Sequence, residues 1–86
     1  MAAALVEERL AACVNILGAV HSVYRWQGKV ESATEIQLII KTSREKLEAV
    51  QAAVQRLHSY QVPEFLVLPV ESGSKAYLHW LYENLE

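Results

Sequence analysis

Residues 14–42 of the chain are VNILGAVHSVYRWQGKVESATEIQLIIKT, two long runs joined by the glycine turn of WQGK. Side chains alternate with a period of two in both runs, at Val20, Ser22, Tyr24 and Trp26 in the first and at Ile36, Leu38 and Ile40 in the second. A period of two is that of a β-strand, and two such runs across a short glycine turn favour a hairpin. Gly18 inside the first run indicates a bulge or kink. The stretch therefore predicts a long β-hairpin.

Helical patterns flank the predicted hairpin. The segment from Ala2 to Ala12 is rich in Ala, Leu and Glu, which favour a helix, with Val6, Leu10 and Cys13 on one face. The sequence TSRE at residues 42–45 has the spacing of a capping box. A second helical stripe follows, at Leu47, Val50, Val54 and Leu57.

The C-terminal third predicts one more strand and one more helix. The run EFLVLP at residues 64–69 is almost continuously apolar, which is typical of a strand covered on both faces. Ser74 is placed to cap a last helix. The side chains of this helix expected to face the body are Tyr77, Leu78, Leu81 and Tyr82.

The order of elements predicts an α+β fold. A hairpin followed by a helix and a strand implies a split βαβ sandwich, in which an antiparallel sheet carries helices on one face. The first helix has no strand before it, so we interpret residues 1–86 as a single domain that lacks its first strand. Because the run at 64–69 would then expose unpaired backbone, we expect a neighbour's segment or residues absent from this chain to fill the gap.

Composition excludes several classes of protein. The 86 residues carry ten acidic and eight basic side chains, a net charge of −2, and the basic residues are scattered, so we expect no nucleic-acid partner. No apolar run approaches the length of a membrane span. The start of the chain does not have the pattern of a signal peptide. The single cysteine, Cys13, cannot form an internal disulfide, which fits a reducing compartment, and we expect a cytoplasmic protein.

Several segments together strongly resemble the CutA family, the divalent-cation tolerance proteins. They are LAACVNI, SVYRWQGKVE, LIIKT and VPEFLVLPVESGSKAYLHWL, and the resemblance runs in register from about Leu5 to Leu81. It implies a ferredoxin-like fold, a homotrimer built by pairing long hairpins, and similarity of shape to the PII regulatory proteins. It also implies a link to copper and other divalent metal ions and, in animals, to the localisation of acetylcholinesterase.

The chain departs from the family pattern at three places. The first strand of the family has no counterpart here, so the cysteine that some members carry in it cannot be transferred. The family's NIxPG appears as NILGA, with Gly18 where proline is usual. The family's HPY appears as HSY, with Ser59 replacing proline. We expect this change to make the backbone around His58 less rigid and to weaken metal binding.

The stretch LHSYQVPE at residues 57–64 holds the candidate ligand site. Copper(II) prefers imidazole nitrogen and accepts carboxylate oxygen, so His58 and Glu64 are the candidate metal ligands, with a second subunit supplying further groups. Tyr60 and Glu64 would line a cleft with Lys41, which we expect to be the partner of Glu64. In the alternative interpretation, His58 only ends its helix favourably against the dipole and Tyr60 only packs.

The remaining chemical groups favour structural roles. Cys13 is expected to be a small buried hydrophobe, and His21 and His79 to be surface or satisfied core residues without metal-ligand spacing. Tyr24 and Trp26 share a strand face, and by the resemblance they contact a neighbouring subunit.

The leading hypothesis is a trimeric copper-binding or divalent-cation tolerance protein. The alternative is a PII-like regulatory or scaffolding trimer that binds a small anion or a protein partner. No nucleophile–base pair is evident, so we expect no enzyme.

Overall fold

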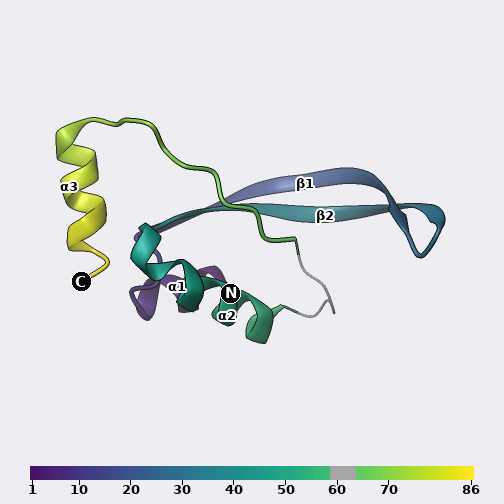
Figure 1. Ribbon diagram of the computed structural model, residues 1–86, viewed down its shortest axis with the longest axis horizontal. Helices are drawn as coiled ribbons and strands as arrows, with labels where there is room; N and C mark the ends of the chain where they lie inside the picture. Colours follow the sequence, from purple (N-terminus) through teal and green to yellow (C-terminus); the bar gives the residue numbers. More distant parts are fainter. Residues whose placement is uncertain (59–63) are drawn as a thin grey trace.

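The computed structural model describes residues 1–58 and 64–86. In this part of the chain the elements are α1 (Ala2–Glu7), β1 (Cys13–Trp26), β2 (Lys29–Lys41), a short 3₁₀ turn η1 (Arg44–Lys46), α2 (Leu47–Leu57) and α3 (Lys75–Glu83). Figure 1 shows that the β1–β2 hairpin extends well beyond the helices on one side, while α3 lies at the opposite end of the molecule. The molecule is correspondingly long, with extents of 46 × 25 × 20 Å.

The predicted hairpin is confirmed. β1 and β2 pair antiparallel from Cys13–Lys41 at the base to Trp26–Lys29 at the tip. Gln27 and Gly28 turn the chain with positive φ angles of 50° and 81°, the combination that matches the twist of two-residue hairpins. The predicted irregularity at Gly18 is also confirmed, because the register shifts between Ile16 and Ala19.

The first helix is shorter than predicted. α1 ends at Glu7, and Arg9 adopts a left-handed φ of 58°. The amides of Arg9 and Leu10 then donate to the carbonyls of Val6 and Leu5, at 3.1 and 3.0 Å, which is the Schellman arrangement of a helix end. Because the helix stops there, the predicted stripe through Val6 is wrong. Leu5 is the fully buried residue of α1 instead.

The predicted capping box is also wrong. Ser43, not Thr42, is the residue before η1, and its side chain makes no capping hydrogen bond. The Thr42 hydroxyl instead donates to the carbonyl of Leu10 at 2.6 Å, joining the end of β2 to the loop after α1. Nearby, the Ala12 amide donates to the carbonyl of Lys41 at 2.9 Å. These two bonds close the base of the hairpin.

Two small apolar clusters hold the helices to this base. Leu5, Ala11 and Ala53 form the first, against which Leu10, Val14 and Ile40 pack, so α1 and α2 cover one side of the hairpin base. Ala12, Leu81 and Leu85 form the second, which ties α3 to the residue before β1. α3 therefore does not join α1 and α2 in one layer, as Figure 1 also shows, and the expectation of helices on a single face holds only for α1 and α2.

The predicted helices α2 and α3 are confirmed, with corrections to the faces that they bury. Val50 and Val54 of α2 are buried, but Leu57 is exposed. Ser74 caps α3 as predicted, since its hydroxyl accepts a bond of 3.3 Å from the amide of Tyr77. Of the side chains expected to face the body in α3, only Leu81 is buried and Leu78 half-buried; Tyr77 and Tyr82 are exposed.

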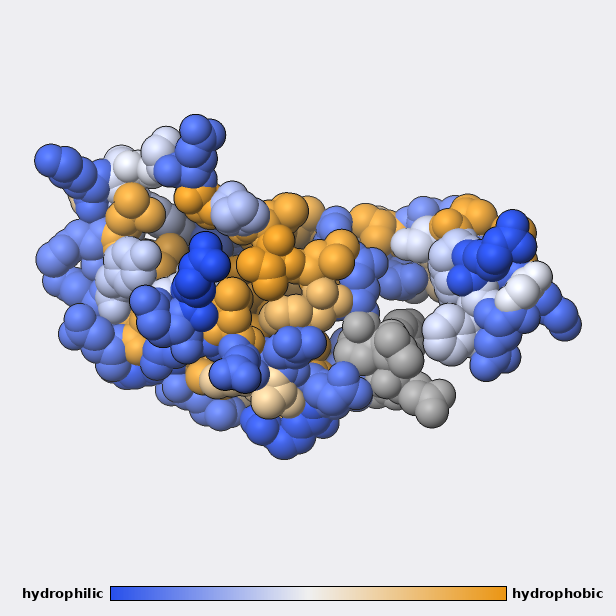
Figure 2. Space-filling model, in the orientation of Figure 1, coloured by the Kyte–Doolittle hydropathy of each residue, from blue (hydrophilic) through white to orange (hydrophobic). Residues whose placement is uncertain are grey.

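The strand predicted at residues 64–69 is wrong. Residues 64–74 form an extended segment without strand pairing, and β1 and β2 are the only strands in the described ranges. A strand exists only beside a hydrogen-bonding neighbour, and none of the described segments lies in that position. Leu66, Leu68 and Val70 are left 78%, 86% and 78% exposed. Figure 2 shows apolar side chains gathered over the middle of the side of the molecule that faces the viewer in Figure 1.

The two glycines of the hairpin make a matched test of its backbone. Gly28 has a left-handed φ of 81°, so Gly28→Ala should lower the free energy of unfolding by about 1 kcal/mol. Gly18 is not left-handed, and an added Cβ would meet no atom within 4 Å, so Gly18→Ala should leave stability unchanged or raise it by about 0.5 kcal/mol. Urea denaturation measures both. Equal losses in the two variants would contradict this account of the turn.

The Thr42 hydroxyl is the second test. Thr42→Val keeps the shape of the side chain but removes the 2.6 Å bond to the Leu10 carbonyl. We expect a loss of about 1–2 kcal/mol in the free energy of unfolding, because a part-buried carbonyl loses its partner. Thr34→Val is the control, since Thr34 is exposed in the middle of β2. Losses of the same size at both positions would show that the bond contributes nothing specific.

Candidate functional site

His58 is the C-cap residue of α2. Its φ and ψ of −87° and 142° turn the chain out of the helix, and its amide donates to the carbonyl of Val54 at 2.8 Å. The residue is half-buried. Its position agrees with both interpretations made from the sequence, a metal ligand or a helix end.

Glu64 begins the extended segment and is exposed. Tyr60 lies outside the described residues, as do Ser59 and Pro63. The structure therefore places His58 and Glu64 on either side of the undescribed residues 59–63 and does not test whether Tyr60 joins them.

Lys41, the last residue of β2, has a different partner from the one predicted. Its ammonium nitrogen Nζ lies 3.3 Å from the hydroxyl of Tyr77 and 5.5 Å from the centroid of the Tyr77 ring. The two ion pairs found among the described residues, Arg56–Glu8 and His79–Glu83, do not include it. Within the described part of this one chain the end of β2 therefore points to α3, and the pairing of Lys41 with Glu64 stays a prediction.

The sequence interpretation missed Tyr77 and Trp80. Their rings lie one turn apart on α3 with centroids 5.5 Å apart and an interplanar angle of 34°. Both are exposed. The spacing i, i+3 in the sequence YLHW places them on one helix face, but only the tertiary structure brings Lys41 beside them.

Tyr24 and Trp26 lie far from Lys41 along the hairpin, opposite Glu31 and Lys29 at its tip. Both rings are exposed, at 41% and 44%. They share one strand face, as predicted, and are accessible to a partner.

The other candidate ligands lie apart from one another. His21 is exposed in β1, and His79 contacts Glu83 at 2.7 Å on the surface of α3. Cys13 is a free, half-buried thiol opposite Lys41 in the ladder. Among residues 1–58 and 64–86, no three His, Cys, Asp or Glu side chains come together in a group that could hold a metal ion.

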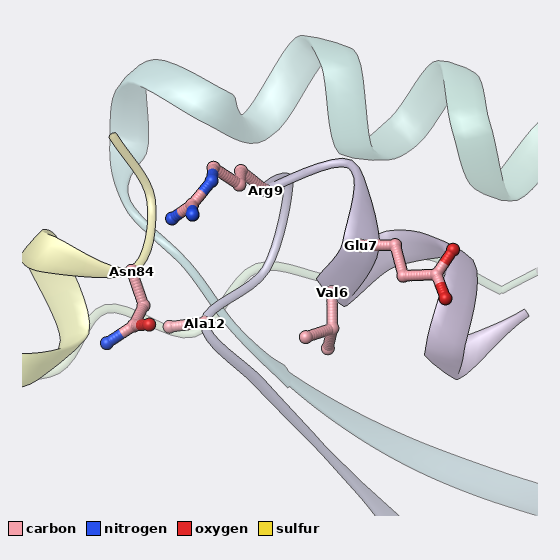
Figure 3. Close-up of a pocket in the computed structure, with 5 residues that line it drawn as sticks. All are labelled: Val6, Glu7, Arg9, Ala12 and Asn84. Atoms are coloured by element: carbon pink, nitrogen blue, oxygen red, sulfur yellow. The ribbon is translucent and has the colours of Figure 1, made fainter.

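A shallow hollow of about 280 Å³ lies between α1 and the end of α3 (Figure 3). It is lined by Val6, Glu7, Arg9, Ala12 and Asn84. Figure 3 shows the Arg9 side chain extending toward the end of α3, while Glu7 points away. A cation beside the carbonyl end of a helix is favourable, so a structural role accounts for Arg9. The hollow contains none of the residues predicted for a site.

The arrangement defines an α+β protein with a protruding hairpin and a terminal helix tied to the hairpin base. A profile of the CutA1 divalent ion tolerance proteins matches residues 1–84, and the chain belongs to this family. The family is one of non-enzymatic tolerance proteins, so the expectation that the chain is not an enzyme is confirmed.

The relatives come from distant organisms. The divalent-cation tolerance protein CutA of Thermus thermophilus is 49% identical over 84 residues, which is 98% of this chain and 82% of that protein. The CutA of Arabidopsis thaliana, described as chloroplastic, is also 49% identical, over 94% of this chain, and this chain spans only 44% of its length.

Solved structures show the same fold. The Thermus thermophilus structure superposes with a TM-score of 0.95 at 48% identity, and 99% of this chain covers 82% of that one. The periplasmic divalent cation tolerance protein CutA of Archaeoglobus fulgidus gives a TM-score of 0.95 at 44% identity, with coverages of 99% and 82%. The predicted family is therefore confirmed. Of the helices described, none has the length and apolar character needed to cross a membrane.

Proposed function

We propose that this chain is a divalent-cation-binding tolerance protein that takes copper or a similar ion and works as a homotrimer. The observation that carries the proposal is family membership over residues 1–84, together with relatives named for divalent-cation tolerance. Because these relatives are named for different compartments, chloroplast and periplasm, the cytoplasmic location expected for this chain stays a prediction.

His58 and Glu64 are the proposed metal ligands. An imidazole and a carboxylate suit copper or zinc, and both lie at the ends of the connection that follows α2. Two donors are fewer than the four that such ions usually take. A stable site therefore needs Tyr60, water or groups of a second subunit, which links metal binding to assembly.

Exposed apolar side chains support the trimer. Ile36 lies on the same side of β2 as Ile40, which packs against the core, yet Ile36 is 68% exposed. Val23 and Val30, nearer the tip, are exposed to a similar degree. An apolar strand face that continues beyond its covering helices favours association. Pairing of hairpins between subunits would cover it.

The metal ligands can be tested by copper titration. His58→Ala and Glu64→Gln should each weaken Cu²⁺ binding by about tenfold or more, because losing even a supporting residue of a metal site has effects of that order. Isothermal titration calorimetry gives the affinity. Mg²⁺ should not compete, since it prefers an octahedral set of oxygen ligands.

His79→Ala is the matched control for this titration. His79 and Glu83 offer the same two kinds of donor, an imidazole and a carboxylate 2.7 Å apart, on the exposed surface of α3. If copper affinity falls with His79→Ala and is insensitive to His58→Ala, the proposed site is wrong.

The trimer can be tested at the hairpin tip. Size-exclusion chromatography with light scattering should give three times the 9.7 kDa of one chain. Trp26→Ala should raise the concentration at which the trimer dissociates by about tenfold or more, since buried aromatic anchors carry much of the energy of an interface. Tyr82→Ala, which removes an exposed aromatic side chain of α3 away from the hairpin, should not. A monodisperse monomer at micromolar concentration would refute the assembly.

The second candidate is a PII-like regulatory trimer that binds a small anion or a protein partner. In this hypothesis Lys41, Tyr60 and Glu64 line the cleft and no metal is needed. The observation in its favour is that Lys41 forms no ion pair with a described residue and keeps its charge for a ligand. Binding of a small anion or a protein partner in the absence of copper would support this second candidate over the first.

A further inference from the structure

Lys41, Tyr77 and Trp80 form a compact cluster where the end of β2 meets α3, and we call it the Lys41–Tyr77–Trp80 cluster. The Lys41 ammonium lies 3.3 Å from the Tyr77 hydroxyl, and the Tyr77 and Trp80 ring centroids are 5.5 Å apart. A cation, a phenol and an indole thus follow one another on an exposed surface.

Several contacts hold the two aromatic side chains in place. The Ser74 hydroxyl accepts from the Tyr77 amide at 3.3 Å and so caps the helix. At the other end, the Asn84 side chain donates to the carbonyl of Trp80 at 2.8 Å. Side-chain hydrogen bonds therefore stabilise both ends of α3, and the Tyr77 and Trp80 rings project from a helix and not from a loop.

Ala12 fixes this helix relative to Lys41. Its amide donates to the Lys41 carbonyl at 2.9 Å, and its side chain packs with Leu81 and Leu85 of the α3 region. The buried residue Ala12 thus contacts both the backbone of Lys41 and the helix α3, which carries Tyr77 and Trp80. The cluster is a product of the tertiary structure and is organised before any ligand arrives.

The hydrogen-bonding capacity of the cluster is only partly used. A lysine ammonium has three donors, and here one of them reaches the Tyr77 oxygen. The Tyr77 hydroxyl accepts that bond, and no described residue accepts its own proton. Two donors with spare capacity lie next to each other, a pattern that suits an oxyanion. The exposed indole beside them offers a flat apolar surface.

We propose that the Lys41–Tyr77–Trp80 cluster binds a small anion whose carboxylate or phosphate group is attached to a planar ring. The oxyanion accepts from the Lys41 ammonium and from the Tyr77 hydroxyl. The ring of the ligand stacks on Trp80. Lys41 also belongs to the anion-binding cleft of the second candidate function, but Tyr77 and Trp80 do not. The site uses none of the proposed metal ligands.

The test follows Trp80 directly. The chain is labelled with 5-fluorotryptophan, and ¹⁹F NMR then separates Trp80 from Trp26, which are the two tryptophans of the sequence. Phenyl phosphate, benzoate, inorganic phosphate and phenol are titrated in the presence of a metal chelator. We expect saturable shifts of the Trp80 signal with phenyl phosphate or benzoate, while Trp26 at the hairpin tip stays unchanged. Whichever of phenyl phosphate and benzoate binds more tightly shows whether the cluster prefers a phosphate or a carboxylate group.

Matched variants locate the contacts. Tyr77→Phe keeps the ring and removes the hydroxyl, and Lys41→Met removes the charge, so each should weaken binding by about tenfold. Tyr82→Phe is the control on the same helix, and Lys29→Met is the control at the other end of β2. Circular dichroism and thermal melting verify that each variant folds.

Three outcomes would overturn the proposal. Inorganic phosphate could bind as tightly as phenyl phosphate, phenol could bind as tightly as the anions, or Tyr77→Phe could bind like the unaltered chain. Because the metal is chelated, loss of copper binding in His58→Ala has no bearing on the result. If Lys41→Met abolishes binding and Tyr77→Phe does not, the ligand belongs to the cleft of the second candidate function.

Discussion

The closure of the hairpin base is the constraint on which the rest of the structure depends. Two hydrogen bonds, from Ala12 to the Lys41 carbonyl and from Thr42 to the Leu10 carbonyl, join the chain entering β1 to the chain leaving β2. The clusters around Leu5 and around Leu81 both form on this base, one for α1 and α2 and one for α3. Without the closure neither set of helices has a surface to pack against.

This core is small for the apolar content of the chain. Leu5 and Val50 are the largest fully buried side chains among the described residues, and much of the rest of the core is alanine. Meanwhile large apolar residues stay exposed along the hairpin and on residues 64–70. Apolar surface of this extent favours association, because covering it releases water. This exposed apolar surface is the common reason for the trimer proposed above and for the strand partner expected for residues 64–69.

The chemical groups are distributed over three separate places. His58 and Glu64 flank residues 59–63, the aromatic pair Tyr24 and Trp26 occupies the hairpin tip, and Lys41 faces α3. No single described surface combines them. In this member of the divalent ion tolerance family, the candidate groups are therefore spread over separate places and not gathered at one.

The sequence by itself determined the hairpin, its turn and bulge, and the helices α2 and α3, because each depends on local periodicity, on glycine or on a capping serine. It also determined the family, through segments that span nearly the whole chain. The early end of α1 could not be predicted, since Arg9 takes a left-handed position that glycine usually occupies. The missing strand at residues 64–69 and the contact between Lys41 and Tyr77 were decided only by the tertiary structure. Strand pairing and a contact across 36 residues both depend on which segment lies alongside, and local pattern carries no information about that neighbour.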